Sequence, residues 1–202
     1  MNACVAFSQR IILDLFECGI DEAGRGCIAG SMFVVGVVGD FKALEALGVK
    51  DSKTLSQKRR NALALKLLDA PEVFYYAYKA SATKIDAIGL SACLKEALSE
   101  IKVYFSLLVD VRAFVFDGNC NYGVEGIKTL VRGDGLHPCI KAASILAKYY
   151  KDEESRFLDK RFPRYKLAKN KGYLTKEHLE FIKTYGLTEV HRASYKIKSL
   201  QG

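Results

Sequence analysis

Four acidic residues lie where predicted strands or helices end, and carboxylates at such positions suit divalent-metal chemistry. Asp21 and Glu22 follow one apolar run, Asp117 follows another, and Asp134 lies between two glycines. Carboxylate oxygens and water are the ligands that Mg²⁺ and Mn²⁺ favour. Carboxylates brought close together without a cation would repel each other. If the four acids converge, a bound metal ion is the natural explanation.

The adjacent pair Asp21 and Glu22 places a condition on the backbone. Neighbouring residues of a regular strand point to opposite faces, so we expect the strand to end or bulge at this pair if both carboxylates reach one site. Gly24 and Gly26, which follow, allow such a break. For each acid alone, an exposed loop position is the competing interpretation. For Asp134 a helix cap competes strongly, because a helix is predicted to begin nearby.

The residue pattern predicts an α/β fold. Runs rich in Val, Met, Phe and Tyr predict three early strands in meander order, and a fourth strand follows a long amphipathic helix. Strands are expected at residues 16–20, 31–38, 72–81 and 112–117, and the main helices after a cap at Ser56 and at residues 88–108, 138–154 and 175–185. In open α/β sheets, sites form at the carboxyl ends of strands.

The charge of the chain is unevenly distributed. Residues 1–140 contain 16 Lys and Arg against 16 Asp and Glu, whereas residues 141–202 contain 15 against 7. This asymmetry is typical of contact with a polyanion, because Lys and Arg near phosphates release condensed counterions. A solvated cationic surface is the alternative. We expect one domain over residues 1–202, with about 141–202 packed on it as a basic helical segment.

Spacing excludes several classes of protein. The six cysteines form no C-x-x-C pair and complete no zinc-ligand spacing with the three histidines, so reduced thiols are expected. The glycines after Glu22 do not fit a dinucleotide fingerprint, and the segment from Asp117 lacks the glycine and glutamate of a calcium loop. No nucleophile elbow surrounds Ser144. The N-terminus lacks the features of a secretion signal, and residues 26–39 are too short for the roughly 20 apolar residues of a membrane span. A cytoplasmic protein with no membrane partner is expected.

Taken in order, a series of sequence blocks resembles the ribonuclease HII family over residues 19–195. No single block is specific, but their shared order is. The blocks are G-I-D-E-A-G-R-G from Gly19, D-S-K-T-L-S from Asp51, F-D-G-N from Phe116, G-D from Gly133, I-K-A-A-S-I-L-A-K from Ile140, N-K-G-Y-L-T-K-E-H from Asn170 and H-R-A-S-Y from His191.

The resemblance implies an endonuclease that cleaves the RNA strand of RNA–DNA hybrids. It also implies cutting on the 5′ side of ribonucleotides embedded in duplex DNA, which leaves 5′-phosphate and 3′-hydroxyl ends. The implied fold is a ribonuclease H-like mixed sheet flanked by helices, and the implied cofactor is Mg²⁺ or Mn²⁺. The protein is expected to act as a monomer on such hybrids and ribonucleotide-containing duplexes.

The resemblance also implies roles for single residues. Asp21, Glu22, Asp117 and Asp134 would be metal-binding catalytic acids. The substrate contacts would be made by Gly24, Arg25 and Gly26 at the ribose 2′-hydroxyl, by Lys53 near a phosphate, and by Tyr173 on the sugar after the ribonucleotide. The residues themselves agree, since a glycine-rich turn lets the backbone approach a sugar closely and the 2′-hydroxyl distinguishes RNA from DNA.

Some positions depart from the family pattern. Prolines are usual in place of Cys27 and Ser31. Ser or Ala is common in place of Lys141, Arg in place of Lys151, and Phe in place of Tyr195. We expect these departures to affect packing and phosphate contacts rather than the four acids.

Alternative interpretations stay open on the residues alone. Another nuclease or strand-transferase of the same fold would share the acidic cluster but lack the glycine-arginine-glycine turn. A non-catalytic nucleic-acid-binding protein would need only the basic segment. Gly24 and Gly26 could serve only the turn, and Tyr173 could be a core aromatic.

Overall fold

A mixed five-stranded sheet forms the centre of the protein, which confirms the predicted fold class. The computed structural model describes residues 16–49 and 55–197. The strand order is β3-β2-β1-β4-β5, with antiparallel pairing among the first three strands and parallel pairing of β1 with β4 and of β4 with β5. The strands are β1 (Phe16–Ala23), β2 (Met32–Gly39), β3 (Val73–Ala80), β4 (Val111–Asp117) and β5 (Ile127–Leu130).

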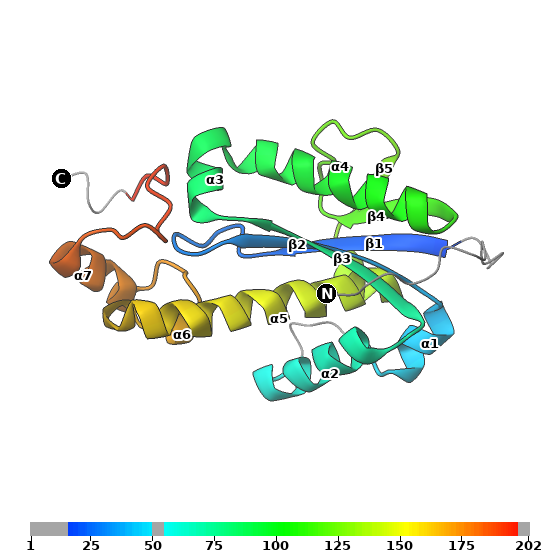
Figure 1. The fold of residues 1–202 in the computed structure, drawn as a ribbon, viewed down its shortest axis with the longest axis horizontal. Helices are drawn as coiled ribbons and strands as arrows, with labels where there is room; N and C mark the ends of the chain where they lie inside the picture. The colour runs from blue at the N-terminus through cyan, green and yellow to red at the C-terminus, as the bar shows by residue number, and fades with distance from the viewer. Residues whose placement is uncertain (1–15, 50–54, 198–202) are drawn as a thin grey trace, which may run out of the picture.

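Helices cover both faces and one end of the sheet (Figure 1). On one face lie α3 (Ala82–Ile88) and α4 (Leu90–Leu108), and on the opposite face lie α1 (Phe41–Ala46), α2 (Gln57–Asp69) and α5 (Pro138–Arg161). Beyond the sheet end lie α6 (Leu167–Asn170) and α7 (Lys176–Tyr185), and two 3₁₀ turns flank α5, η2 (Gly133–Gly135) and η3 (Pro163–Tyr165). Ser56 caps α2 as predicted, by accepting a hydrogen bond from the Arg59 amide. Within the described ranges, no helix is long and apolar enough to cross a membrane.

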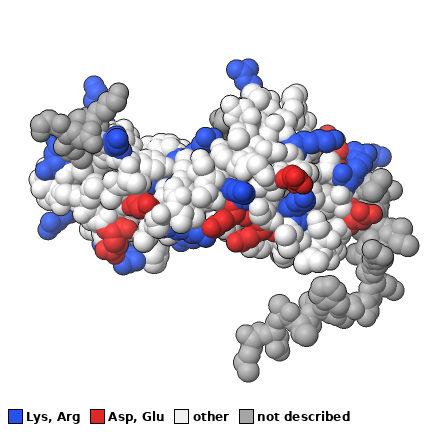
Figure 2. Space-filling model, turned by 90° about the horizontal axis from the view of Figure 1, so that it is seen from above, with Lys and Arg blue, Asp and Glu red and all other residues white. Residues whose placement is uncertain are grey.

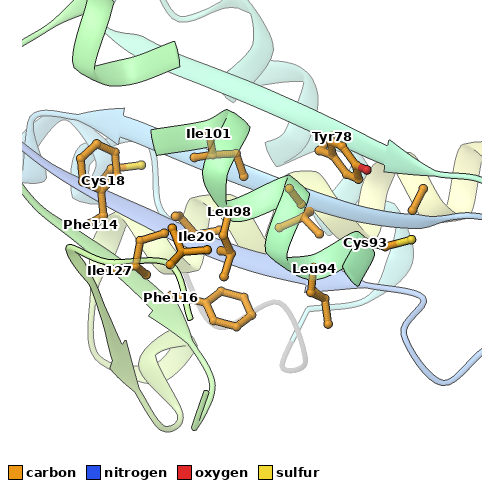
Figure 3. Close-up of a cluster of buried hydrophobic side chains, with 14 of the residues drawn as sticks. Cys18, Ile20, Tyr78, Cys93, Leu94, Leu98, Ile101, Phe114, Phe116 and Ile127 are labelled. Carbon is orange, nitrogen blue, oxygen red and sulfur yellow. The ribbon is translucent and has the colours of Figure 1, made fainter. Parts of the chain in front are cut away.

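Two apolar clusters hold the helices against the sheet. Between the sheet and α4, the cluster includes Ile20, Leu98 and Phe116, which point toward one another in Figure 3. On the opposite face, Val35 and Ile145 belong to the cluster that joins the sheet to α2 and α5. Burial of each such large side chain contributes roughly 1.5–3 kcal/mol. The two clusters therefore fix the ends of β1 and β4 between two layers of helices.

Three element boundaries differ from the sequence-based prediction. β1 continues through the two acids to Ala23, because β2 pairs with it in unbroken register along that length. The predicted break or bulge at the acids is therefore wrong. The helix expected at residues 88–108 is α4, which begins at Leu90 after Gly89 with φ of 81°, and the short helix α3 before it was not predicted. The helix from Pro138 ends at Arg161 rather than near residue 154.

The C-terminal segment packs against the loop that follows β1. Ile28 and Ala29 of that loop belong to a third apolar cluster, together with Leu158 of α5 and Ile182 of α7. An isolated bridge pairs Ala29 with His191. Residues far apart in the sequence therefore meet beside the carboxyl end of β1.

Candidate active site

A cleft of about 820 Å³ opens beside the carboxyl ends of β1 and β4. Asp21, Glu22 and Asp117 line this cleft together with the turn at residues 24–26. Tyr173 borders the same space. Of the nine predicted site residues, Lys53 lies outside the described residues, and Asp134 is absent from the lining.

The geometry of β1 explains how two adjacent acids border one opening. Asp21 pairs with Val35 and Glu22 with Val34, so β1 is a regular strand on its β2 side. On the other side, the pairing of β1 with β4 ends at Ile20. β1 therefore projects beyond β4, and both faces of its last residues border the cleft. The Asp21 carboxylate also accepts a hydrogen bond of 2.7 Å from the Glu22 amide.

Burial and mutual repulsion favour the protonated forms of these two carboxyls. Burial raises the pKa of Asp21 well above its usual range, and the charges of Glu22 and Asp117 raise it further, against a hydrogen bond from Ser144. Burial also raises the pKa of Glu22 to about 7, with Arg25 opposing the shift and Asp117 adding to it. These shifts are typical of sites whose charge is compensated by a ligand.

Asp117 and Asp134 are connected through η2. The Gly133 amide donates a hydrogen bond of 3.0 Å to the Asp117 carboxylate, which ties the end of β4 to the segment that carries Asp134. Asp134 is buried at 3% exposure. The competing helix-cap interpretation is wrong, because α5 begins at Pro138 with His137 at its cap position. Asp134 is therefore a buried residue in the segment that is hydrogen-bonded to Asp117, and it is not among the residues that line the cleft.

The carboxylates of the acids are close together, but they are not arranged as a set of metal ligands. In the described part of the chain, no three His, Cys, Asp or Glu side chains are arranged to hold a metal ion. The Oε2 oxygen of Glu22 is nevertheless buried without a hydrogen-bond partner among the described residues. A buried oxygen of this kind is costly unless a cation or donor satisfies it. The donor set, all carboxylate oxygen, suits Mg²⁺ or Mn²⁺.

The turn at residues 24–26 closes one side of the cleft. Gly24 has φ of 87°, and a Cβ there would lie 2.7 Å from the Ser31 carbonyl oxygen, so the turn requires glycine at this position. The Arg25 guanidinium lies 3.7 Å from the Glu22 carboxylate. The turn therefore stands directly beside the acids.

Tyr173 lies on the surface of the cleft rather than in the core, with 40% of its surface exposed. The interpretation of Tyr173 as a core aromatic is therefore wrong. The carbonyl of Gly172, the preceding residue, accepts hydrogen bonds from the amides of Ile28 and Ala29 at 2.8 and 3.2 Å. These bonds connect the Tyr173 segment to the loop that follows the turn. The same loop therefore helps to position both the Tyr173 ring and the turn.

Two buried histidines hold the backbone of Tyr173. The Thr188 amide donates to Nδ1 of His191, so neutral His191 carries its proton on Nε2 and donates to Nε2 of His178, 3.2 Å away. His178 then carries its proton on Nδ1 and donates to the Tyr173 carbonyl at 2.9 Å. Burial lowers the pKa of His191 to about 4, so the neutral pair persists at neutral pH.

The cleft also contains cationic residues that the sequence did not single out. Arg60 of α2, Lys148 of α5 and Arg132 line it. The Lys148 ammonium lies 5.7 Å from the centre of the Tyr173 ring. Lysine and arginine are too frequent for sequence alone to distinguish these three. Lys151, by contrast, is buried and donates a hydrogen bond to the Ala29 carbonyl, so its role is structural.

Comparison with known proteins gives one consistent result. The ribonuclease HII family model matches residues 18–198. A protein named ribonuclease HII from Helicobacter pylori (strain G27) is 46% identical over 189 residues, covering 90% of this chain and 91% of that protein. A chain in the structure of the PCNA:RNase HII complex from Archaeoglobus fulgidus is 28% identical with a TM-score of 0.77, covering 91% and 96% of the two chains. Bst-RNase HIII in complex with Mn²⁺ has the same fold, with a TM-score of 0.71, 20% identity and coverage of 90% and 67%.

Proposed function

The chain belongs to the ribonuclease HII family and is an endonuclease that cleaves the RNA strand of RNA–DNA hybrids, and we propose that it does so in the cleft at the ends of β1 and β4. One observation carries this proposal: Asp21, Glu22 and Asp117 line the same cleft as the turn at residues 24–26. Acids that suit phosphodiester hydrolysis thus stand beside a backbone turn that suits a sugar. Either feature alone would be compatible with other functions.

Asp21, Glu22, Asp117 and Asp134 are the residues that would hold a divalent cation. Mg²⁺ and Mn²⁺ both suit this oxygen donor set, and Mn²⁺ is bound by the Bst-RNase HIII relative. A bound divalent ion supplies water activation and charge stabilisation at the phosphate. The chain contributes the buried Glu22 Oε2, the raised pKa values of Asp21 and Glu22, and the connection of Asp117 to η2.

Substrate choice would come from the turn and from Tyr173. Gly24, Arg25 and Gly26 would place backbone groups against the ribose 2′-hydroxyl, the group that RNA has and DNA lacks. The exposed Tyr173 ring would lie on the next sugar, and Lys53 would lie near a phosphate. The cut would then fall on the 5′ side of a ribonucleotide, in hybrids and in DNA duplexes that contain one. Nothing in this arrangement requires a second copy of the chain, so a monomer suffices.

The catalytic role of the acids is tested by Asp117→Asn. We expect the variant to fold and to bind a hybrid in EDTA like the unaltered protein, while its cleavage rate with Mg²⁺ falls by at least about a hundredfold. Asp110→Asn is a matched control, because Asp110 is an exposed acid just before β4. A cleavage rate of Asp117→Asn close to that of Asp110→Asn would refute the assignment.

A further inference from the structure

Arg192 lies buried behind the turn at residues 24–26, with 1% of its surface exposed. Its Nη2 donates to the Gly24 carbonyl at 2.7 Å, and its Nη1 donates to the Arg25 carbonyl at 2.8 Å. Nε and Nη2 both donate to the Gly30 carbonyl, and Nη1 also donates to the Tyr195 hydroxyl. A guanidinium has five N–H groups. The five hydrogen bonds use all of them, and three of the bonds go to the turn or to the hydroxyl that supports it.

Tyr195 completes this support. Its hydroxyl accepts from Nη1 of Arg192 at 2.9 Å, so its own proton is available for the Arg25 carbonyl, also at 2.9 Å. The Arg25 carbonyl thus receives hydrogen bonds from both side chains. The two residues form one brace against the back of the turn.

The direction of these carbonyls determines what the turn presents to the cleft. A peptide bond is planar and trans, so its N–H points opposite to its C=O. The Gly24 and Arg25 carbonyls point toward Arg192, and the amides of Arg25 and Gly26 must therefore point away from it. Neither amide donates a hydrogen bond to any described residue. Both belong to residues that line the cleft.

We infer that Arg192 and Tyr195 are positioning residues that set the selectivity of the turn for ribose over deoxyribose. They act through the peptide planes of residues 24–26 and not through contact with the substrate. The inference rests on the proposed role of the turn in reading the 2′-hydroxyl. By holding the two amides in one orientation before the substrate arrives, the brace lets an oxygen acceptor bind without reorganisation of the backbone.

Two variants test the brace. Tyr195→Phe removes one hydroxyl and keeps the ring, whereas Arg192→Lys keeps the charge but has only three donors and no planar fork. Tyr165→Phe is a matched control, because the Tyr165 hydroxyl also donates to a backbone carbonyl, that of Gly186 at 2.8 Å, away from the turn. The readout is competition binding in EDTA between a DNA duplex with one ribonucleotide and the same duplex without it, together with melting temperature.

The unaltered protein should prefer the ribonucleotide duplex. Tyr195→Phe should reduce that preference about three- to tenfold and Arg192→Lys by more, with unchanged affinity for the all-DNA duplex, and Tyr165→Phe should retain it. If Tyr195→Phe keeps the full preference, or loses affinity for both duplexes equally with a lower melting temperature, the brace is only structural. If the unaltered protein shows no preference, the proposed role of the turn itself fails. Should Arg192→Lys not fold, Tyr195→Phe alone decides the outcome.

Discussion

Glu22 is a cleft residue whose buried carboxylate destabilises the folded protein when it is charged. Burial raises its pKa to about 7, above the value of roughly 4.3 in an unfolded chain. The folded protein therefore binds this proton more tightly than the unfolded protein does. The contribution of the protonated Glu22 carboxyl to the stability of the fold is fully present below the unfolded pKa and is lost as the pH rises through about 7.

We therefore predict that Glu22→Gln stabilises the metal-free protein at pH 8, where the buried charge is fully developed. The gain in the free energy of unfolding should be on the order of 2 kcal/mol at pH 8 and much smaller at pH 5. Urea unfolding in EDTA at the two pH values measures it. Adding Mg²⁺ or Mn²⁺ should raise the melting temperature of the unaltered protein more than that of Glu22→Gln.

Glu45→Gln controls for the general effect of removing a negative charge, because Glu45 is exposed on α1. It should change stability by less than about 0.5 kcal/mol at either pH. Equal stabilisation by both variants, or none by Glu22→Gln at pH 8, would contradict the electrostatic account of the cleft.

Tyr173 provides a second test at the residue scale. Because its ring is 40% exposed, Tyr173→Ala should lower the melting temperature only slightly. If the ring lies on the sugar after the ribonucleotide, the variant should lose more activity on a DNA duplex with one ribonucleotide than on a long hybrid, by about tenfold or more. Tyr104→Ala is the matched control, since Tyr104 is also 40% exposed but lies on α4. Equal losses on both substrates would remove Tyr173 from the specificity site.

At this scale the sequence indicated which residue types could do chemistry, but not which of them face the cleft. Asp134 stands in the same kind of motif as Asp117, yet it is buried in η2 and does not line the cleft. The role of Arg192 was not predictable. Its partners Gly24 and Arg25 lie more than 160 positions earlier, and nothing local to Arg192 indicates them.

At the scale of elements, the contact between β1 and α5 positions the acids. Gly19 of β1 lies against the first turn of α5, and a Cβ there would come 2.3 Å from the Ile140 nitrogen and 2.4 Å from the Cys139 carbonyl carbon. Backbone atoms cannot yield as a flexible side chain does. This close approach brings β1 and the N-terminal part of α5 together beside the cleft.

Gly19→Ala should therefore destabilise the protein by about 3 kcal/mol or more and lower its melting temperature by roughly 10 °C. Gly135→Ala is a suitable comparison, because a Cβ at Gly135 would meet no atom within 4 Å. Thermal unfolding of the two variants measures the difference. A Gly19→Ala protein as stable as Gly135→Ala would mean that β1 and α5 can separate freely.

Hydrophobic patterns predicted most of the elements and failed at defined places. The apolar run of β1 stops at Ile20, so the polar end of the strand, which β2 holds in register, could not be recognised from apolar residues. The short helix α3 was not predicted, and Gly89 with a positive φ separates it from α4. The last turns of α5 follow from contacts with α6 and η3, which are tertiary. The strand order beyond the first three strands was likewise not predicted.

At the scale of the whole molecule, the basic C-terminal third is less uniform than its composition suggests. Lys166 and Lys169 both pair with the Glu177 carboxylate at 2.8 Å, and Lys183 pairs with Glu180. On the face of the molecule seen in Figure 2, basic and acidic side chains are interspersed, and no purely basic patch covers it. Sequence counts could not show this pairing. Lys148, which lines the cleft that contains the acids, is better placed to meet phosphates.

If the acids, the turn at residues 24–26 and Tyr173 act together as proposed, they determine where the protein cuts. The most direct measurement is end mapping of the products from a DNA duplex that carries one ribonucleotide, incubated with Mg²⁺ or Mn²⁺ beside the identical all-DNA duplex. We predict a single cut on the 5′ side of the ribonucleotide, with a 3′-hydroxyl on one product, a 5′-phosphate on the other and no cleavage of the all-DNA duplex. Comparable cleavage of the all-DNA duplex, or a cut elsewhere with other end groups, would contradict the account.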